Sequence, residues 1–264
     1  MNACRSAEKS PKLVLSEVCK NFGGVTAAQD ICLEIYGGEV LGLIGPNGAG
    51  KTTLINLITG VYPVTRGAVT FGGRDITRQP THKRAIEGIG RTFQHPHLLD
   101  RCDVLTNIIM GSDMAARKRG AGRADLKREL PELLRCAGLE NIDLTDPVSK
   151  LAYGQQKLLE VVRVLLSRPE VLLLDEPAAG LNNRETQYVA DLIRHATRQG
   201  IGVLLITHDI ELALRVADRV AVFKDGTVVE ETAVANFASP DTLVHPFSKQ
   251  LWHALPEHGF EVIA

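Results

Sequence analysis

The sequence predicts an α/β fold in which helices cover a mostly parallel β-sheet. Three short, continuous apolar runs, at residues 171–174, 203–206 and 220–223, are typical of strands that are buried on both faces. Segments with helical apolar spacing separate these runs, as in proteins that alternate strands with helices. A glycine-rich loop between an earlier apolar run and a helical segment is the third observation that favours this class.

The N-terminal part of the chain predicts a separate, small antiparallel sheet. Residues 13–15 and 31–35 alternate in hydropathy as strands do, and residues 21–24 (Asn-Phe-Gly-Gly) are typical of a turn between them. Residues 69–71, which precede a Gly-Gly pair, predict another hairpin strand.

The other elements follow from the same patterns. Residues 40–44 predict a buried strand, and residues 52–59 predict the helix after the glycine-rich loop. From about residue 92 to residue 150 the pattern indicates a helical insertion, with helical spacing over residues 123–138. The basic connector at residues 117–123 could contact phosphates, although such charge runs are more often solvated surface. Two further helices are predicted over residues 187–199 and 210–217.

Composition excludes several classes of protein. Thirty Lys and Arg residues against 31 Asp and Glu residues give a net charge of −1, so the chain lacks the basic field of a typical nucleic-acid binder. No nucleic-acid partner is therefore expected. No apolar run approaches the ~18 residues of a membrane-spanning helix. The five cysteines form no CxxC pair and no Cys/His cluster, which favours reduced, structural thiols.

Residues 45–52 match the phosphate-binding pattern G-x-x-x-x-G-K-[ST] between a predicted strand and a predicted helix. Glycines let the backbone bend so that its amide groups face phosphates, and the helix N-terminus adds a positive dipole end. We expect Lys51 to contact the β- and γ-phosphates, Thr52 to ligate Mg²⁺ and Thr53 to lie near the α-phosphate. The predicted nucleotide-binding residues of this loop are Gly45, Pro46, Asn47, Gly48, Ala49, Gly50, Lys51, Thr52 and Thr53.

Two adjacent acidic residues predict the second half of a nucleoside triphosphate site. Asp175 and Glu176 directly follow the apolar run at residues 172–174. A carboxylate at the end of such a strand contacts the metal ion through water, and its neighbour can polarise the attacking water as a general base. Taken with the phosphate loop, this pair leaves kinases, GTPases and motor ATPases as possible classes.

Residues 151–157 (Leu-Ala-Tyr-Gly-Gln-Gln-Lys) resemble the LSGGQ-type signature of ATP-binding cassette (ABC) proteins. Other landmarks of that family follow in chain order, namely the aromatic residue Phe22, the Q-loop residue Gln94, a D-loop segment that ends at Asn182, and the switch histidine His208. The resemblance covers roughly residues 12–230. It implies a P-loop NTPase (RecA-like) core with an N-terminal antiparallel β subdomain and an α-helical signature subdomain.

The resemblance also implies domain boundaries. The nucleotide-binding domain would span residues 12–236, with a helical subdomain inserted at about residues 95–165, and a C-terminal tail would span residues 237–264. Residues 245–256 of this tail resemble the end of peptide and nickel importer cassettes.

ABC cassettes work in pairs, and each ATP lies between the phosphate loop of one cassette and the signature of the other. The resemblance therefore implies that the signature of this chain binds the γ-phosphate held by a partner cassette, at a helix N-terminus whose amides and dipole suit an anion. The signature residues implied to bind nucleotide are Ala152, Tyr153, Gly154 and Gln155.

The remaining site residues take their roles from the same resemblance. It implies that Phe22 stacks on adenine and that Gln94 completes the shell of Mg²⁺ and water and senses the membrane partner. His208 would contact the γ-phosphate and hold the attacking water together with Glu176. The implied metal-site residues are Thr52, Gln94 and Asp175, and the implied catalytic residues are Lys51, Glu176 and His208.

Two positions depart from the pattern of the family. Ala152 stands where the signature has a serine, and Asn182 stands where the D-loop has an aspartate. The loss of one hydrogen bond to the γ-phosphate would cost about 1 kcal/mol, so backbone amides must carry more of that contact. Because Glu176 and His208 are retained, we expect an ATPase that couples hydrolysis to transport. A catalytically silent, regulatory cassette is the alternative that the departures favour.

Several segments resemble the ATPases of branched-chain amino-acid importers in particular. These segments are residues 45–63, 88–94, 151–156 and 175–182. The chain is thus expected to bind and hydrolyse ATP and to energise the uptake of branched-chain or other amino acids through separate permease subunits. Urea importers use similar cassettes, and the tail favours a peptide or nickel importer, so these substrates remain alternatives.

The implied partners are a second cassette (an identical copy or a paralogue), two membrane permease subunits and, indirectly, a solute-binding protein. The implied location is the cytoplasmic face of the inner (cell) membrane, as a peripheral subunit, with residues 94–99 as the candidate docking surface. A non-transport ABC protein acting on ribosomes or DNA is disfavoured by the single cassette and by the lack of sustained heptads. An exporter cassette is disfavoured by the lack of fused membrane spans.

Overall fold

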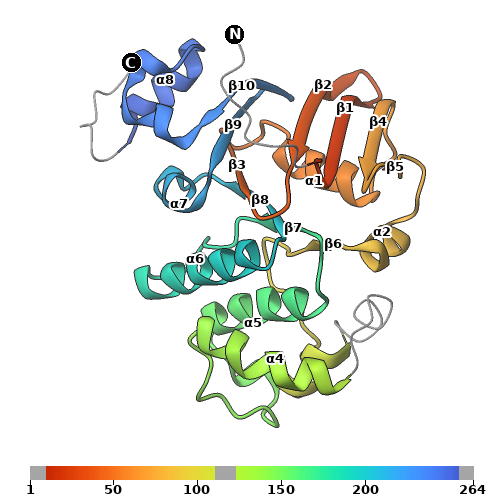
Figure 1. Cartoon of the computed structure of the whole chain (residues 1–264), viewed down its shortest axis with the longest axis vertical. Helices are drawn as coiled ribbons and strands as arrows, with labels where there is room; N and C mark the ends of the chain where they lie inside the picture. Colours follow the sequence, from red (N-terminus) through yellow and green to blue (C-terminus); the bar gives the residue numbers. More distant parts are fainter. Residues whose placement is uncertain (1–9, 111–122, 256–264) are drawn as a thin grey trace.

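The computed structural model describes residues 10–110 and 123–255 of the chain (Figure 1). Its main parts are an antiparallel sheet, a larger sheet and a group of helices at the lower end of the view. The basic connector predicted at residues 117–123 lies outside the described residues, except for the residue that begins α4 (Arg123–Cys136). Within the described ranges, no helix has the length and apolarity that crossing a membrane requires.

The N-terminal sheet is antiparallel, as predicted, with the strand order β2-β1-β4-β5. β1 (Leu13–Phe22) and β2 (Val25–Ile35) are joined at the predicted Gly-Gly turn. β4 (Arg66–Phe71) pairs with β1 and with the two-residue strand β5 (Arg74–Asp75). Since successive side chains of a strand point to opposite faces, the apolar alternate residues form the buried face. They include Leu13, Leu15, Ile31, Leu33 and Ile35.

The larger sheet has six strands in the order β10-β9-β3-β8-β7-β6. Its four central strands are those that the apolar runs predicted, and they pair in parallel: β3 (Val40–Ile44), β7 (Val171–Asp175), β8 (Gly202–Thr207) and β9 (Arg219–Lys224). The sequence patterns did not predict the edge strands β6 (Ile89–Arg91) and β10 (Thr227–Ala233). The first has only three residues, and most of the second is only half-buried, so neither has a continuous buried apolar run.

Helix α1 (Lys51–Thr59) lies between the two sheets, where its apolar side chains join residues of both sheets in one hydrophobic cluster. Burial of a Leu or Ile side chain contributes about 1.5–3 kcal/mol, so the four buried in this helix hold its N-terminus firmly at the end of β3. They are Leu54, Ile55, Leu57 and Ile58. The short helix α2 (Thr81–Glu87), which was not predicted, packs beside α1. Its buried Arg84 donates from Nη1 to the carbonyls of Leu57 (2.9 Å) and Ile58 (2.7 Å) in α1.

The opposite face of the larger sheet is covered by α5 (Tyr153–Leu166), α6 (Asn183–Arg198) and α7 (Ile210–Val216). α4 packs against α5 and α6 at the lower end of Figure 1, and residues 104–110 are also helical. Helices therefore cover both faces of the sheet, which confirms the predicted α/β class. The segments predicted as helices at residues 123–138, 187–199 and 210–217 correspond to α4, α6 and α7.

The residues after β10 fold back against the larger sheet. They form η2 (Val234–Ala238), η3 (Pro240–Thr242) and α8 (Pro246–His253), and the indole N–H of Trp252 donates to the carbonyl of Phe237 at 2.8 Å. The domain boundary at residue 236 stays a prediction. In the structure, Phe237 packs in one small cluster with residues of β3, α7 and β9.

Candidate active site

The phosphate loop joins the end of β3 to the start of α1. Gly45 lies so close to β9 that a Cβ atom there would be 2.0 Å from the carbonyl oxygen of Phe223. Gly50 precedes α1 with φ of 104°, in the left-handed region that side chains disfavour. The loop therefore requires glycine at both positions. The start of a helix leaves backbone N–H groups without intrahelical partners, which makes this end of α1 suited to an anion.

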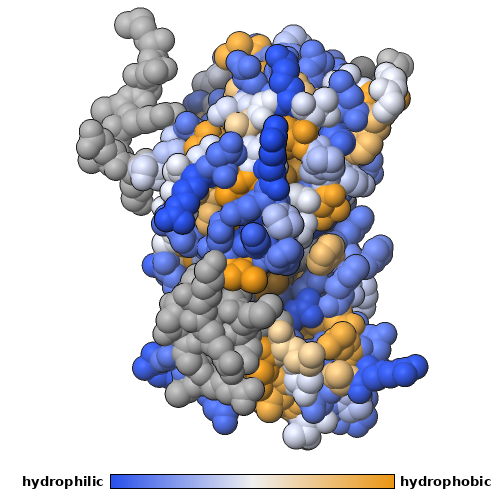
Figure 2. All heavy atoms as spheres, turned by 90° about the vertical axis from the view of Figure 1, so that its right-hand side faces the viewer, coloured by the Kyte–Doolittle hydropathy of each residue, from blue (hydrophilic) through white to orange (hydrophobic). Residues whose placement is uncertain are grey.

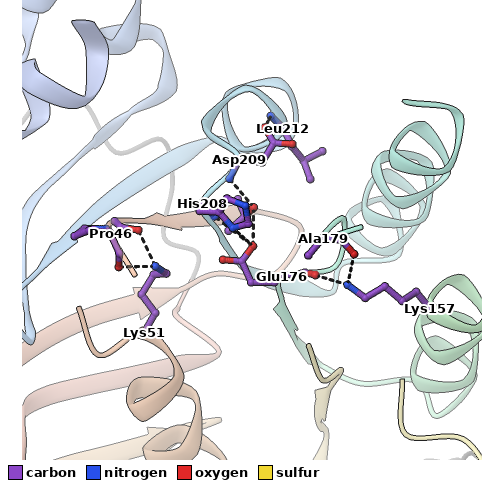
Figure 3. Close-up of polar contacts among 10 residues, drawn as sticks. Pro46, Lys51, Lys157, Glu176, Ala179, His208, Asp209 and Leu212 are labelled. Atoms are coloured by element: carbon purple, nitrogen blue, oxygen red, sulfur yellow. Dashed lines mark hydrogen bonds and ion pairs between the residues drawn. The ribbon is translucent and has the colours of Figure 1, made fainter. Parts of the chain in front are cut away.

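The ammonium group of Lys51 lies inside the curve of this loop. Its Nζ donates to the carbonyl oxygens of Gly45 at 2.7 Å and Pro46 at 2.9 Å (Figure 3). Burial lowers the pKa of Lys51, and the nearby carboxylates of Glu176 and Asp175 oppose that shift. Among the described residues, Lys51 donates to neutral carbonyls and forms no direct ion pair with those carboxylates, which favours an anionic ligand beside it.

Asp175 ends β7 as a buried carboxylate, and burial raises its pKa. The guanidinium of Arg91 opposes this shift, with Nη2 3.5 Å from Oδ2 of Asp175. Arg91 is itself positioned by a hydrogen bond of 2.6 Å from Nη1 to Oδ1 of Asn56 in α1. Sequence reasoning assigned Arg91 no role, because its position on the edge strand β6 beside β7 was not predicted.

Glu176 follows Asp175 in the left-handed region, with φ of 49°. Its Oε2 lies 2.8 Å from Nδ1 of His208 and 3.3 Å from both the backbone nitrogen of His208 and Oγ1 of Thr207. Asp209, which follows His208, is the N-cap of α7 and accepts from the backbone N–H of Leu212 at 2.9 Å (Figure 3). The end of β8 and the start of α7 thus hold the carboxylate of Glu176 in place.

These elements border an open cavity of about 290 Å³. The phosphate loop, the end of β7 and the Q-loop meet there, so residues from widely separated parts of the chain share one site. Thr52, Gln94 and Asp175 all line it, and their side chains carry hydroxyl, amide and carboxylate oxygens of the kind that suit Mg²⁺. The lining residues are Asn47, Gly48, Gly50, Lys51, Thr52, Thr53, Gln94, Asp175, Glu176 and Ile206.

Some of the predicted site residues lie elsewhere. Phe22 does not line the cavity; the residue is 43% exposed, and its ring makes an edge-to-face contact with Tyr62 at 5.1 Å between ring centroids. His208 contacts Glu176 at the margin of the cavity with 59% of its side chain exposed. The signature residues are also absent from the lining, because they begin α5, which packs on the face of the larger sheet opposite α1. These are Ala152, Tyr153, Gly154 and Gln155.

The signature segment is nonetheless well ordered by its neighbours. Oε1 of Gln155 accepts from the backbone N–H of Ala152 at 3.0 Å. A Cβ atom at Gly154 would lie 2.1 Å from Oε1 of Glu185, so glycine lets the start of α6 pack against the start of α5. Asn182 caps α6, since its Oδ1 accepts from the N–H groups of Arg184 and Glu185 at 3.0 Å each. Asparagine is as good an N-cap as aspartate, so this departure from the family pattern preserves the local structure.

Two buried charged residues of α5 were missed by sequence reasoning. Lys157 Nζ donates to the carbonyls of Glu176 at 2.7 Å and Ala179 at 3.0 Å. Glu160 accepts from the backbone N–H groups of Phe93 at 3.3 Å and His97 at 3.1 Å, which flank Gln94, and burial raises its pKa. Their signal in the sequence is a run of charged residues at three-residue spacing (Lys157, Glu160 and Arg163) among the apolar residues of this helix.

Comparison with known proteins shows the family of the chain. The family model described as "ABC transporter" matches residues 28–179. The high-affinity branched-chain amino acid transport ATP-binding protein LivG of Salmonella typhimurium is 38% identical over 229 residues, which cover 82% of this chain and 89% of the relative. The chain belongs to the ABC transporter family, and the predicted ABC-type ATPase is confirmed.

Two solved structures support the same fold. The ADP conformation of an ATP-binding cassette of an ABC transporter superposes with a TM-score of 0.77 at 27% identity, covering 92% of this chain and 98% of that one. A dimeric cassette in a post-hydrolysis state bound to ADP and Pi has a TM-score of 0.73 at 27% identity, covering 84% and 98%. The predicted P-loop NTPase core with its antiparallel β subdomain and helical subdomain is therefore confirmed.

Proposed function

We propose that this chain is the ATP-hydrolysing subunit of an importer and that it energises uptake of branched-chain amino acids through separate membrane permeases. The observation that carries the ATPase site is the cavity that joins the phosphate loop to Asp175, Glu176 and Gln94. The similarity to LivG, whose name gives branched-chain amino acid transport, supports the solute.

In this proposal the loop residues 45–53 bind the phosphates of ATP. Lys51 exchanges its two loop carbonyls for the β- and γ-phosphate oxygens, which are stronger acceptors because they are charged. Thr52, Gln94 and Asp175 would hold Mg²⁺, directly or through water. When bound, that ion neutralises charge on the phosphates. Phe22, exposed at the end of β1, is the proposed contact for adenine.

Glu176 is the proposed general base. It orients the attacking water and accepts its proton, while His208 keeps the carboxylate aimed at the cavity and contacts the γ-phosphate. Thr207 and the backbone of His208 support the same carboxylate oxygen, so it is positioned before ATP arrives.

Because the signature residues lie outside the cavity of their own chain, we propose that they complete the cavity of a second copy. The N-terminus of α5 would then approach the γ-phosphate held by the partner. Ala152 brings no hydroxyl to that contact, so the backbone N–H groups around Gly154 supply it. The dimeric cassette that superposes on this chain supports such pairing.

The proposed contact with the permeases lies on the helical side of the molecule. Figure 2 shows hydrophobic side chains in both halves of the face it presents, including the lower half, which holds α4 and α5 in Figure 1. The exposed large hydrophobic residues between β6 and residue 110 are Phe93, Leu99 and Met110. We propose that residues 94–99 dock the permeases, which places the chain at the cytoplasmic face of the cell membrane.

Pairing leads to a direct expectation. The variant Glu176→Gln, mixed with ATP and Mg²⁺, should change from monomer to dimer, because bound ATP that is not hydrolysed bridges the two chains. Size-exclusion chromatography with light scattering measures the mass. ADP and the variant Lys51→Met serve as controls that leave the chain monomeric. A monomer at saturating ATP would contradict pairing of identical copies.

Uptake in the cell that encodes this chain tests the proposed function. Replacing the chain by its Glu176→Gln variant should abolish uptake of radiolabelled leucine, isoleucine and valine, while the wild-type chain restores it. Uptake of urea, dipeptides and nickel is measured in the same cells. A loss confined to one of these three solutes would assign the chain to that importer instead.

A further inference from the structure

The backbone of Glu176 is held in an uncommon conformation by contacts on all sides. Its φ of 49° lies in the left-handed region, which residues with a side chain adopt only when the surroundings enforce it. Its N–H donates to the carbonyl of Ile206 at 2.9 Å, and its carboxylate contacts Thr207 and His208. Its carbonyl oxygen accepts from Lys157 Nζ at 2.7 Å and from the backbone N–H of Ala179 at 3.2 Å.

Lys157 reaches this carbonyl from α5, opposite the side on which His208 meets the carboxylate (Figure 3). Its side chain is only 3% exposed, and the same Nζ donates to the carbonyl of Ala179 at 3.0 Å. One ammonium group thus ties together both ends of the turn that follows Asp175. Burial lowers the pKa of Lys157, and Glu176, Glu160 and Asp175 oppose that shift.

Burying a lysine is costly unless its hydrogen bonds are made, so its position needs a reason beyond packing. A methionine would fill similar space on α5 without that cost. What an ammonium adds is a charge-assisted hydrogen bond to a carbonyl whose orientation decides where the Glu176 side chain points. Without Lys157, only the longer hydrogen bond from the Ala179 N–H would hold this carbonyl. The peptide could then turn toward a more common φ, and the carboxylate would leave its place beside His208.

The geometry points to Lys157 as a positioning residue that holds Glu176 in its reactive orientation. This inference rests on the proposed role of Glu176 as the general base. The same role would link the two ATP sites of a cassette pair, because Lys157 lies one helical turn after Tyr153 of the signature. In the proposed pair, the signature contacts one ATP while Lys157 on the same helix positions the base for the other.

The test compares Lys157→Met, Lys157→Arg and the exposed control Lys127→Met in the purified full chain. ATPase kinetics give kcat and KM, and calorimetry gives the affinity for ATP. We expect Lys157→Met to lower kcat about tenfold or more with KM and ATP affinity within about twofold, because a small misplacement of a catalytic group costs rate and not binding. Arginine keeps a charged donor and should recover most of the lost kcat.

A second comparison separates positioning from a general loss of structure. In single-turnover experiments on the Glu176→Gln background, adding Lys157→Met should lower the residual rate no further, since the group that it positions is already gone. If Lys157→Met does not fold, Lys157→Gln, which keeps one donor group, replaces it in every measurement.

The outcomes distinguish the role of Lys157 from the role of Glu176. A wild-type kcat for Lys157→Met, or a loss that falls on KM and ATP affinity, overturns the role of Lys157 even if Glu176→Gln is inactive. The role of Lys157 is also overturned if adding Lys157→Met to Glu176→Gln lowers the single-turnover rate by the same factor as in the wild-type background. Wild-type turnover by Glu176→Gln alone overturns the proposed role of Glu176 itself.

Discussion

The variant Glu176→Gln should bind ATP with near wild-type affinity and hydrolyse it at least about 10²-fold more slowly. The amide retains an oxygen that can accept from Thr207 and the backbone of His208, so the fold of this segment is preserved. It has no basicity with which to take a proton from water. The loss should therefore appear in kcat, measured by phosphate release, and not in ATP affinity, measured by calorimetry.

The exposed residue Glu140 offers a matched control, since Glu140→Gln makes the same chemical change at a residue outside the cavity lining. It should retain wild-type kcat. Equal turnover by Glu176→Gln and Glu140→Gln would show that Glu176 is not the base. Inactivity of the wild-type chain under all conditions, including with its permeases, would instead favour a regulatory cassette.

Replacing Lys51 by methionine should weaken ATP binding by about 10²-fold or more. Each hydrogen bond from a charged donor to a phosphate contributes about 1.5–3 kcal/mol, and about 1.4 kcal/mol corresponds to a factor of ten in affinity. The measurement is a titration with ATP in the absence of turnover. Lys83→Met, at an exposed position on α2, is the control and should bind as the wild type does.

Stability should respond differently from binding in this variant. Burial lowers the pKa of Lys51, so the folded chain holds that proton less tightly than the unfolded chain. In the range between the lowered value and the usual lysine pKa, this group makes the wild type more stable as pH rises. Lys51→Met should lack that component and keep a melting temperature near or above that of the wild type at neutral pH. A large fall would show that the two carbonyl contacts stabilise the fold.

Much of the central architecture could be predicted from the sequence. The apolar runs that became β3, β7, β8 and β9 are buried on both faces, and such strands leave an unambiguous pattern. The phosphate loop could be placed between β3 and α1, because its glycines have a backbone requirement that no other residue meets. Short or half-exposed elements such as β6, α2 and β10 lack that pattern, and they were missed.

The site was predictable where function depends on residue type and unpredictable where it depends on tertiary contact. Thr52, Gln94, Asp175 and Glu176 were assigned from motifs, and the structure brings them to one cavity, while their individual roles remain predictions. Lys157 could not have been identified in this way. Its partners are the backbone carbonyls of Glu176 and Ala179, and no motif indicates that these lie beside it in the fold.

The position of β3 in its sheet has a consequence for biosynthesis. β3 ends at Ile44, yet both of its neighbours, β8 and β9, come from residues beyond 200, and Gly45 fits against Phe223. Most of the chain must therefore be synthesised and emerge from the ribosome before the phosphate loop acquires its shape. Until then this strand has exposed edges, which makes the nascent chain a natural client for molecular chaperones.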